Sequence, residues 1–429
     1  MEGVAFGHAD YDVWGSRAAV SSGATRHSRR CAVRNRTGHT EPVKRAVIAA
    51  IVFAAASTAT VHPASPSLAA GAAVAEDPRR VRVSHASSMR ELVDELCSDR
   101  CAGRAAGTEG GRIARGVVID ALRTVGLDPF EQAVPKARGA NVLATIPGEI
   151  DRYVMVAAHY DHLGTVGRHV YRGADDNAAS VAILVDVARR LAAARPMGRG
   201  VIIAAFDAEE PPYFLTAAMG SEHFARHPTV PLERIDMMVC LELVGHALGD
   251  AHRPSEVRRT MFLLGAERSE GTLTHVHALA RTEPGLIIRP ADAEVIPRLS
   301  DYAAFWERER PFVLLTGGRS RHYHTPDDLP QYLDFARMQA TAAWIERFVR
   351  EQCARHEAPF VFRDRRDDAT TLDSIGDLLT PLATVSDVAA MGAQMARSLR
   401  ARVRRDGALP HDARGQLEQL VAGIESSFA

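Results

Sequence analysis

The sequence predicts a three-layer α/β/α sandwich with a mixed, mainly parallel central sheet and an added helical C-terminal segment. Short apolar runs that suit buried strands alternate along the chain with amphipathic helical patterns. This is the order of elements in parallel α/β sheets. Several of the runs end in histidine or acidic residues, and the carboxyl ends of such strands are where these sheets carry function. After about residue 360 the composition becomes charged and helix-prone, which predicts the added helices.

The individual elements follow from the spacing of apolar residues. The expected strands are 141–146, 153–158, 200–206, 237–241 and 311–315. The expected helices are 88–97, 112–125, 178–194 and 334–351, then 377–382, 385–404 and 413–428 in the C-terminal segment. The glycine-rich stretch 107–111 is expected to be a loop. We therefore predict a leader over 1–75, a main domain over 84–353 and a helical extension over 360–429.

Length and composition allow a large core and exclude some partners. The chain has 429 residues, of which 46% are hydrophobic. Its 52 basic and 53 acidic residues give a formal net charge of −1. This balance offers no argument for a nucleic-acid partner or for attraction to an acidic membrane.

The amino terminus has the composition of an export signal. Residues 1–45 are basic, and the apolar segment 46–61 follows Lys44 and Arg45 directly. That segment is short for a spanning helix, which needs about 20 residues. A small-x-small site at 73–75 precedes Glu76, as in a cleavable signal. We expect a secreted or periplasmic mature chain, or else an uncleaved anchor, in which case the membrane would be a partner.

Four cysteines remain after such cleavage: Cys97, Cys101, Cys240 and Cys353. An oxidising compartment permits disulfides, and Cys97 and Cys101 are four residues apart near a helix end. A disulfide between them and two free thiols are both open alternatives. The set lacks the Cys-x-x-Cys spacing of a zinc site.

Five separate segments place histidine or carboxylate residues at the ends of apolar runs or in loops. Each has an ordinary explanation as a helix cap or a solvated surface. Glu242 is less easily explained, because a lone carboxylate in an apolar run is costly to bury unless it is paired or binds metal. Together the segments suit zinc, with manganese or cobalt as competitors, and five ligands with one bridging carboxylate suit a two-metal site. The residues are His159 and Asp161, Asp175 and Asp176, Glu209 and Glu210, Glu242, and His322 and His324.

The order of these motifs closely resembles the secreted di-zinc aminopeptidases, a superfamily (peptidase clan MH) that includes the glutaminyl cyclases. The resemblance spans residues 157–328, and Gly103-Arg104 and Gly107-Thr108 extend it toward the amino terminus. The matching blocks are AAHYDH, GADDNAAS, FDAEE followed by MGSEHF, LELVG, SDYAAFW and YHTPDD.

The resemblance implies two zinc ions per chain. One would be bound by His159, Asp176 and Glu242, and the other by Asp176, Glu210 and His324, so that Asp176 bridges. In the family the peptide bond that follows this aspartate is cis.

Three further roles are implied by the same resemblance. Glu209 matches the general base, and Asp161 matches the partner of His159. Tyr323 matches a residue that in some members donates to the oxyanion. The insertion 211–215 after the paired glutamates departs from many relatives and leaves the specificity open.

The implied function is that of an extracytoplasmic zinc aminopeptidase acting on peptides with a free N-terminus. Two alternatives stay open. One is glutaminyl cyclase-type acyl transfer on a single zinc, and the other is a non-enzymatic binding module on the same fold.

Overall fold

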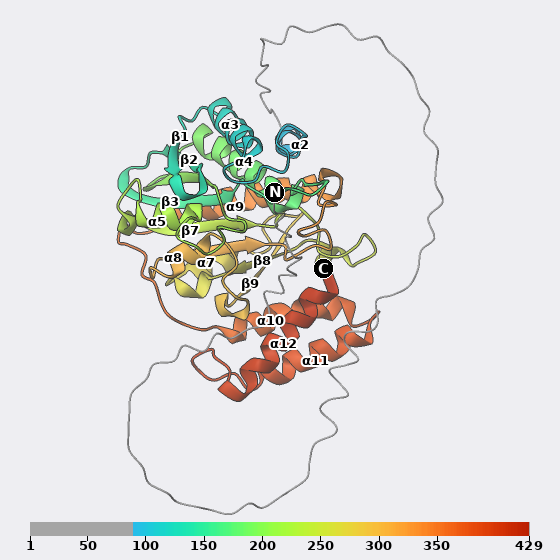
Figure 1. Ribbon diagram of the computed structural model, residues 1–429. Coiled ribbons are helices and arrows are strands. Elements are labelled where there is room, and N and C mark those ends of the chain that lie inside the picture. Colours follow the sequence, from blue (N-terminus) through green and yellow to red (C-terminus); the bar gives the residue numbers. More distant parts are fainter. Residues whose placement is uncertain (1–88, 429) are drawn as a thin grey trace, which may run out of the picture. The chain divides into compact units, whose positions relative to one another are not determined.

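The computed structural model describes residues 89–428, and its central feature is an eight-stranded mixed sheet (Figure 1). The strand order is β1-β2-β6-β3-β7-β10-β8-β9, with parallel pairing from β6 through β3 and β7 to β10 and again between β8 and β9. This confirms the predicted fold class. The strands are β1 (Phe130–Val134), β2 (Gly139–Ile146), β3 (Ile150–His159), β6 (Arg199–Phe206), β7 (Ile235–Glu242), β8 (Thr260–Leu264), β9 (Ile287–Ala291) and β10 (Phe312–Thr316), with a separate hairpin of β4 (Gly164–Val166) and β5 (His169–Tyr171).

Helices cover both faces of the sheet, and each face has its own apolar core. Leu92, Val118 and Ile183 pack on one face, and Phe224 and Phe305 on the other. The four central strands are covered on both sides, which explains why their sequences are nearly continuous apolar runs. The helices are α2 (Met89–Leu96), α3 (Glu109–Thr124), α4 (Ala179–Ala193), α5 (Gly220–Arg226), α6 (Ser255–Arg258), α7 (Thr272–Leu279), α8 (Tyr302–Trp306) and α9 (Phe335–Ala354).

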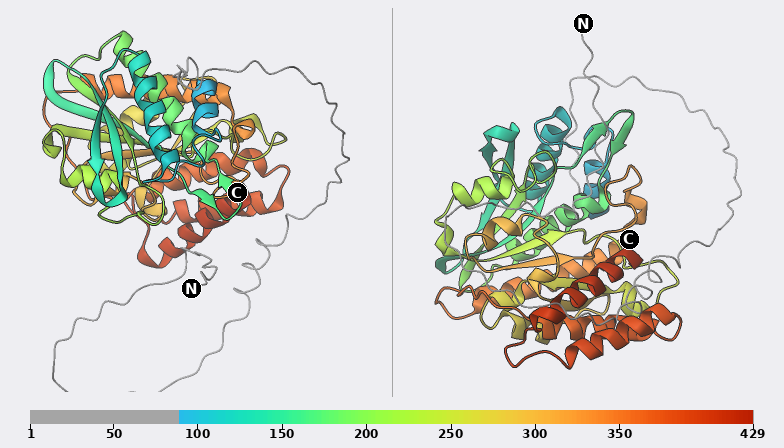
Figure 2. Two further views of the ribbon diagram at one scale, coloured as in Figure 1. Left: turned by 45° about the horizontal axis from the view of Figure 1, so that its top comes forward. Right: turned by 60° about the horizontal axis from the view of Figure 1, so that its bottom comes forward.

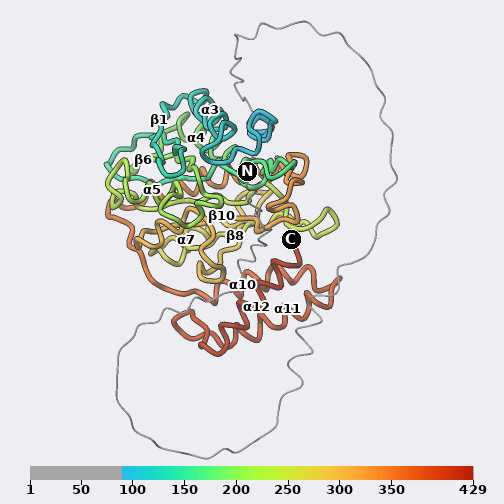
Figure 3. Tube along the Cα trace, viewed as in Figure 1, coloured from blue at the N-terminus to red at the C-terminus, as the bar shows by residue number. Residues whose placement is uncertain are grey.

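Three C-terminal helices form a bundle with a further core beside β8 and β9 (Figures 2 and 3). They are α10 (Asp368–Leu379), α11 (Asp387–Arg400) and α12 (His411–Phe428). Leu378 and Leu417 are fully buried in this core, which also includes Leu248 and Val257 of the main domain. The bundle therefore packs on the main domain through shared apolar contacts.

Two predicted boundaries are wrong, and both errors come from helix starts. The stretch 107–111 is not all loop, because α3 begins at Glu109 and the Thr108 hydroxyl caps it by accepting from the N–H of Gly111 (3.1 Å). Gly110 allows close backbone packing, since a Cβ there would lie 2.1 Å from the carbonyl oxygen of Cys101. The helix expected over 377–382 begins earlier, at Asp368, where Asp367 is the cap.

The open question about the cysteines has an answer in the described chain. Cys97, Cys101, Cys240 and Cys353 are all buried and free. The predicted leader, the apolar segment 46–61 and the cleavage site before Glu76 lie outside the described residues. Among residues 89–428 there is no helix with the length and apolarity needed to cross a membrane.

Candidate metal centre

The predicted site residues meet at the carboxyl edge of the parallel strands. His159 ends β3 and Glu242 ends β7. Glu209 and Glu210 follow β6 closely, and His324 lies in the loop after β10. Because these strands run parallel, residues distant in sequence converge at one edge.

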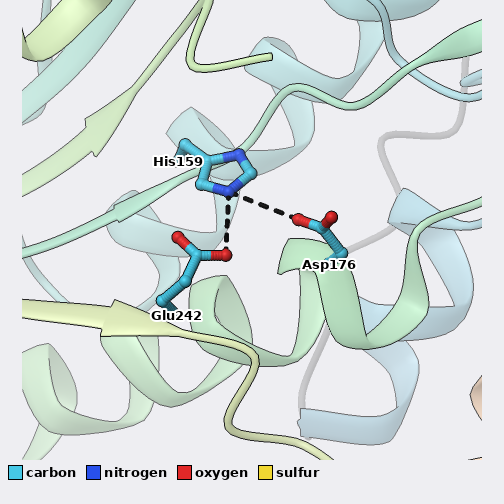
Figure 4. Close-up of side chains that lie close together, drawn as sticks. All are labelled: His159, Asp176 and Glu242. Carbon is cyan, nitrogen blue, oxygen red and sulfur yellow. Dashed lines mark hydrogen bonds and ion pairs between the residues drawn. The ribbon is translucent and has the colours of Figure 1, made fainter. Parts of the chain in front are cut away.

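Asp176 lies between two sets of donor atoms. Its Oδ1 is 3.4 Å from Nε2 of His159, and that nitrogen is 3.3 Å from Oε1 of Glu242. Figure 4 shows these three side chains converging from β3, β7 and the turn at Asp176. On its other side, Asp176 Oδ2 is 3.2 Å from Nε2 of His324, which is also 3.2 Å from Oε2 of Glu210.

These spacings fit zinc. Ligand atoms about 2.0–2.2 Å from a tetrahedral zinc lie about 3.3–3.6 Å from one another. Two of the four distances, 3.3 and 3.4 Å, lie in this range, and the other two, both 3.2 Å, lie just below it. Neutral imidazole and carboxylate are also donors that zinc accepts. The residues present therefore fit two metal ions that share Asp176.

The charges of the site favour a cation as well. Burial would lower the pKa of His159, but the carboxylates of Glu242 and Glu209 outweigh it and raise that pKa well above its ordinary value. Burial likewise opposes a positive charge on His324, yet Asp176 and Glu210 raise the pKa of His324 to about 10. The buried carboxylates thus attract positive charge, which a divalent ion can supply.

The model of peptidase family M28 matches residues 141–349, which contain all of these donors. We refer to residues 141–349 below as the M28 domain, after the family model that matches them. The match confirms the superfamily that the sequence motifs indicated.

Two known proteins are similar to this chain in sequence. The uncharacterized protein YfbL of Escherichia coli is 29% identical over 48% of this chain and 70% of its own length. The glutaminyl-peptide cyclotransferase of Drosophila melanogaster is 24% identical over 64% of this chain and 84% of its own.

Two solved structures share the fold of the M28 domain. LapA of Legionella pneumophila, an aminopeptidase by name, has a TM-score of 0.53 and 16% identity over 63% of this chain and 73% of its own. A Zn-dependent exopeptidase from Parabacteroides distasonis has a TM-score of 0.50 and 19% identity over 62% of this chain and 97% of its own.

The backbone around Asp176 in the M28 domain is held from several sides. The buried Arg104 guanidinium donates to the carbonyl oxygens of Tyr160 (2.8 Å), Gly173 (2.5 Å) and Asp176 (3.0 Å). The carboxylate of Asp328 accepts from the N–H of Asp176 (3.0 Å). The peptide bond between Asp176 and Asn177 is cis, as the family resemblance implied.

The two adjacent aspartates face different partners. Asp175 accepts from the N–H groups of Gly245 (2.8 Å) and His246 (3.1 Å) and from His246 Nδ1 (2.7 Å). It therefore supports the loop after β7, while Asp176 alone faces both donor sets.

The carboxylate of Asp161 holds the backbone of the paired glutamates and contacts the ring of His159 less closely. Its two carboxylate oxygens accept from the N–H groups of Glu209 (3.0 Å) and Glu210 (3.2 Å). Nδ1 of His159 donates to the main-chain carbonyl of Asp161 at 3.2 Å, whereas the carboxylate is 3.5 Å away. Asp161 is therefore the partner of His159, as expected, but mainly through its main-chain carbonyl.

Glu209 points toward the donor cluster and is buried. Its Oε2 is 3.9 Å from Nε2 of His159. Burial and the nearby charges of Glu242 and Glu210 raise the pKa of Glu209 well above its ordinary value, although His159 opposes this. A carboxyl group with a raised pKa is suited to accepting and returning a proton.

The sequence analysis did not assign a role to His162, which lies in this site. Its Nδ1 donates to Oε1 of Glu210 at 2.7 Å, and the same Nδ1 is 3.8 Å from Oδ2 of Asp176. His162 could also complete a metal group with these carboxylates. The 2.7 Å spacing suits a hydrogen bond better than two ligands of one zinc, so we interpret His162 as the partner that orients Glu210. The only sequence signal was its place three residues after His159.

Tyr323 stacks on His324, with ring centres 3.9 Å apart and planes 15° apart. Burial and the surrounding carboxylates, first that of Asp176, raise the pKa of the Tyr323 hydroxyl, which keeps it a donor. The His324 side chain is 31% exposed, whereas that of His159 is 1% exposed. The site is therefore more open to solvent on the side of Tyr323 and His324.

The insertion 211–215 continues directly from Glu210. The N–H of Tyr213 donates to the carbonyl of Glu210 (3.0 Å), and Tyr213 packs against a small cluster of Val134, Ala137 and Ala208. Leu215 is 49% exposed. Part of the insertion thus anchors the chain after Glu210, while its tip faces solvent.

Proposed function

We propose that this chain is a two-zinc aminopeptidase that hydrolyses N-terminal peptide bonds outside the cytoplasm. The observation that carries the proposal is the position of Asp176, whose two carboxylate oxygens face separate imidazole–carboxylate pairs. A single-metal site would require only one such pair. The match of the M28 domain to a peptidase family supports hydrolysis as the reaction class.

The reaction is the addition of water across the scissile amide bond. When bound, two zinc ions polarise the scissile carbonyl and make water a stronger nucleophile. Glu209 accepts the proton from the attacking water and delivers it to the leaving amine, so it ends each cycle ready to act again. Tyr323 donates a hydrogen bond to the developing oxyanion.

The geometry around the ligands supports the proposed aminopeptidase specificity. The α-amine of a peptide is cationic or a hydrogen-bond donor, and the buried carboxylates of Glu209 and Glu210 and the half-buried carboxylate of Glu242 all lie at the donor cluster. A chain end fits such a closed site better than the middle of a polypeptide does. His324 and Tyr323 form the more open side, where the rest of the substrate would leave the site.

The test is a panel of aminoacyl-anilides with purified protein, together with metal analysis. We expect about two zinc ions per chain and hydrolysis that is lost when the amine is acetylated. A second candidate function is glutaminyl cyclase activity, which the similarity to the Drosophila melanogaster cyclotransferase favours. A peptide with N-terminal glutamine distinguishes it from the aminopeptidase. Release of free glutamine supports the aminopeptidase, while loss of ammonia to give pyroglutamate with one zinc supports the cyclase.

The proposed location has its own test. Export with cleavage before Glu76 predicts that mass spectrometry of exported protein finds a chain beginning near that residue. A chain beginning upstream of residue 46 would instead support a membrane anchor.

A further inference from the structure

We propose that the C-terminal helix α12 positions the metal-site loop 317–325 through an ion pair between Glu425 and Arg319. The bundle lies beyond residue 349, where the family match ends. The inference rests on the proposed function, because it concerns the loop that carries Tyr323 and His324.

A continuous chain of contacts joins α12 to the second donor set. Oε1 of Glu425 is 2.6 Å from Nε of Arg319, and both side chains are half-buried, with 21% and 35% exposure. The Arg319 guanidinium lies 5.8 Å from the centre of the Tyr323 ring, within the range of a cation–π contact. Tyr323 in turn stacks on His324. Three successive contacts therefore link the helix to His324, a proposed zinc ligand.

The loop itself needs such support. It begins with Gly317 and Gly318, and Gly318 has a φ of +80° and open space around the position of a Cβ. Two consecutive glycines leave the backbone with much conformational freedom. The N–H of Gly317 donates to the carbonyl of Leu243 (2.9 Å), while the N–H of Tyr323 bonds within the loop, to Ser320 (3.0 Å). Side-chain anchors therefore contribute strongly to where His324 lies.

The helix is a firm support because it is fixed along its length. Arg414 near its start pairs with the buried Asp368 of α10, and Leu417 is fully buried in the bundle core. Near its end, the Phe428 ring lies 5.8 Å from the guanidinium of Arg253 and would be 3.3 Å from a Cβ at Gly249. Glu425 thus projects from a helix held on both sides of it.

The test compares Glu425→Gln, Arg319→Gln and the double variant with a matched control. The control is Asp412→Asn, which removes an exposed ion pair with Arg402 (2.6 Å) in the same bundle, away from the loop. We measure hydrogen exchange of residues 317–325 in metal-free protein, the affinity for the second zinc by chelator competition, kcat, KM and the melting temperature.

We expect both single variants to speed exchange in the loop and to weaken the second zinc about three- to tenfold. Because the ion pair is one contact, the double variant should be no worse than Arg319→Gln alone, which also loses the cation–π contact with Tyr323. kcat should fall more than KM rises, and the melting temperature should match that of Asp412→Asn. Arg319→Lys should restore part of the loss, since it keeps the charge.

Unchanged loop exchange and unchanged zinc affinity in Glu425→Gln would overturn the inference. So would additive losses in the double variant, or equal losses in the Asp412→Asn control. If the unmodified protein hydrolyses no peptide, the proposed function fails, but loop exchange and zinc affinity still decide whether α12 positions the loop.

Discussion

At the scale of single residues, the site gives two neighbours of the same type different tasks. The carboxylate of Glu210 is fixed by His162 at 2.7 Å and lies 3.2 Å from Nε2 of His324. Glu209 has a looser contact, 3.9 Å from His159. Since Asp161 holds both of their N–H groups, the side chains diverge from a shared anchor. One glutamate is therefore placed as a ligand and the other remains free to carry a proton.

Glu209→Gln should abolish most turnover and leave the metal content unchanged. The change keeps the shape of the side chain but removes its ability to accept a proton, and loss of a general base typically costs about 10²–10⁴-fold in rate. Glu210→Gln should instead lose zinc first and activity as a consequence. Measuring kcat and zinc per chain for both variants checks the two roles. The assignment would have to be exchanged if Glu209→Gln lost zinc while Glu210→Gln kept it.

At the scale of elements, the loop after β10 brings Tyr323 to the open side of the site. We expect Tyr323→Phe to lower kcat more than it raises KM, because a contact to the oxyanion is made mainly in the transition state. The ring and its stacking on His324 are retained, so zinc affinity should not change. Steady-state kinetics with one anilide substrate, compared with the parent protein, measures the split. A rise in KM with unchanged kcat would give Tyr323 a role in substrate binding instead.

The junction of β9 with the C-terminal bundle predicts a pH effect on stability. Burial, together with the charge of Asp292, raises the pKa of Glu267 from 4.5 to about 8, although Arg268 opposes this. Between pH 4.5 and about 8, the folded protein therefore holds a proton on Glu267 that the unfolded chain releases. The sign follows from proton linkage: this group's contribution to stability is fully present below pH 4.5, falls as the pH rises to about 8 and is flat above.

Glu267→Gln removes this titration and keeps the size of the side chain. The melting temperature of the variant, relative to the parent, should therefore rise between pH 5 and pH 8. Glu256→Gln, a change at an exposed position of α6, serves as the control and should follow the parent. A constant difference between Glu267→Gln and the parent over this range would show that Glu267 does not titrate in the folded state.

Most strands of the central sheet and the proposed ligands could be predicted from the sequence, and the reasons are physical. The runs of β3, β6, β7 and β10 are apolar because both faces of each strand are covered, and their polar residues stand out where the runs stop. β1, β8 and β9 were not predicted, and the short β9 contains Arg289 and Pro290, which suggest a loop. The contact of Glu425 with Arg319 spans 106 residues, and no local pattern signals such a pairing.

At the scale of the whole molecule, the proposed metals should stabilise the described fold. The five proposed ligands come from segments spread between β3 and the loop after β10, so metal binding joins parts of the chain that are far apart in sequence. A ligand that binds only the folded state adds stability according to its concentration relative to its Kd, about 4 kcal/mol at a thousandfold excess. Zinc removal should therefore weaken the entire M28 domain rather than one loop.

Chelation should lower the melting temperature by roughly 5–10 °C at that excess, and added zinc should restore it. Asp176→Ala should show little of this difference, because the variant loses a ligand shared by both metals. Calorimetry of the parent and of Asp176→Ala, each with chelator and with zinc, gives the four values needed. Damage to the fold itself, as opposed to loss of metal, would lower the melting temperature of metal-free Asp176→Ala below that of the metal-free parent. Two tightly bound zinc ions and a full zinc-dependent shift in Asp176→Ala would show that this carboxylate does not bridge the site.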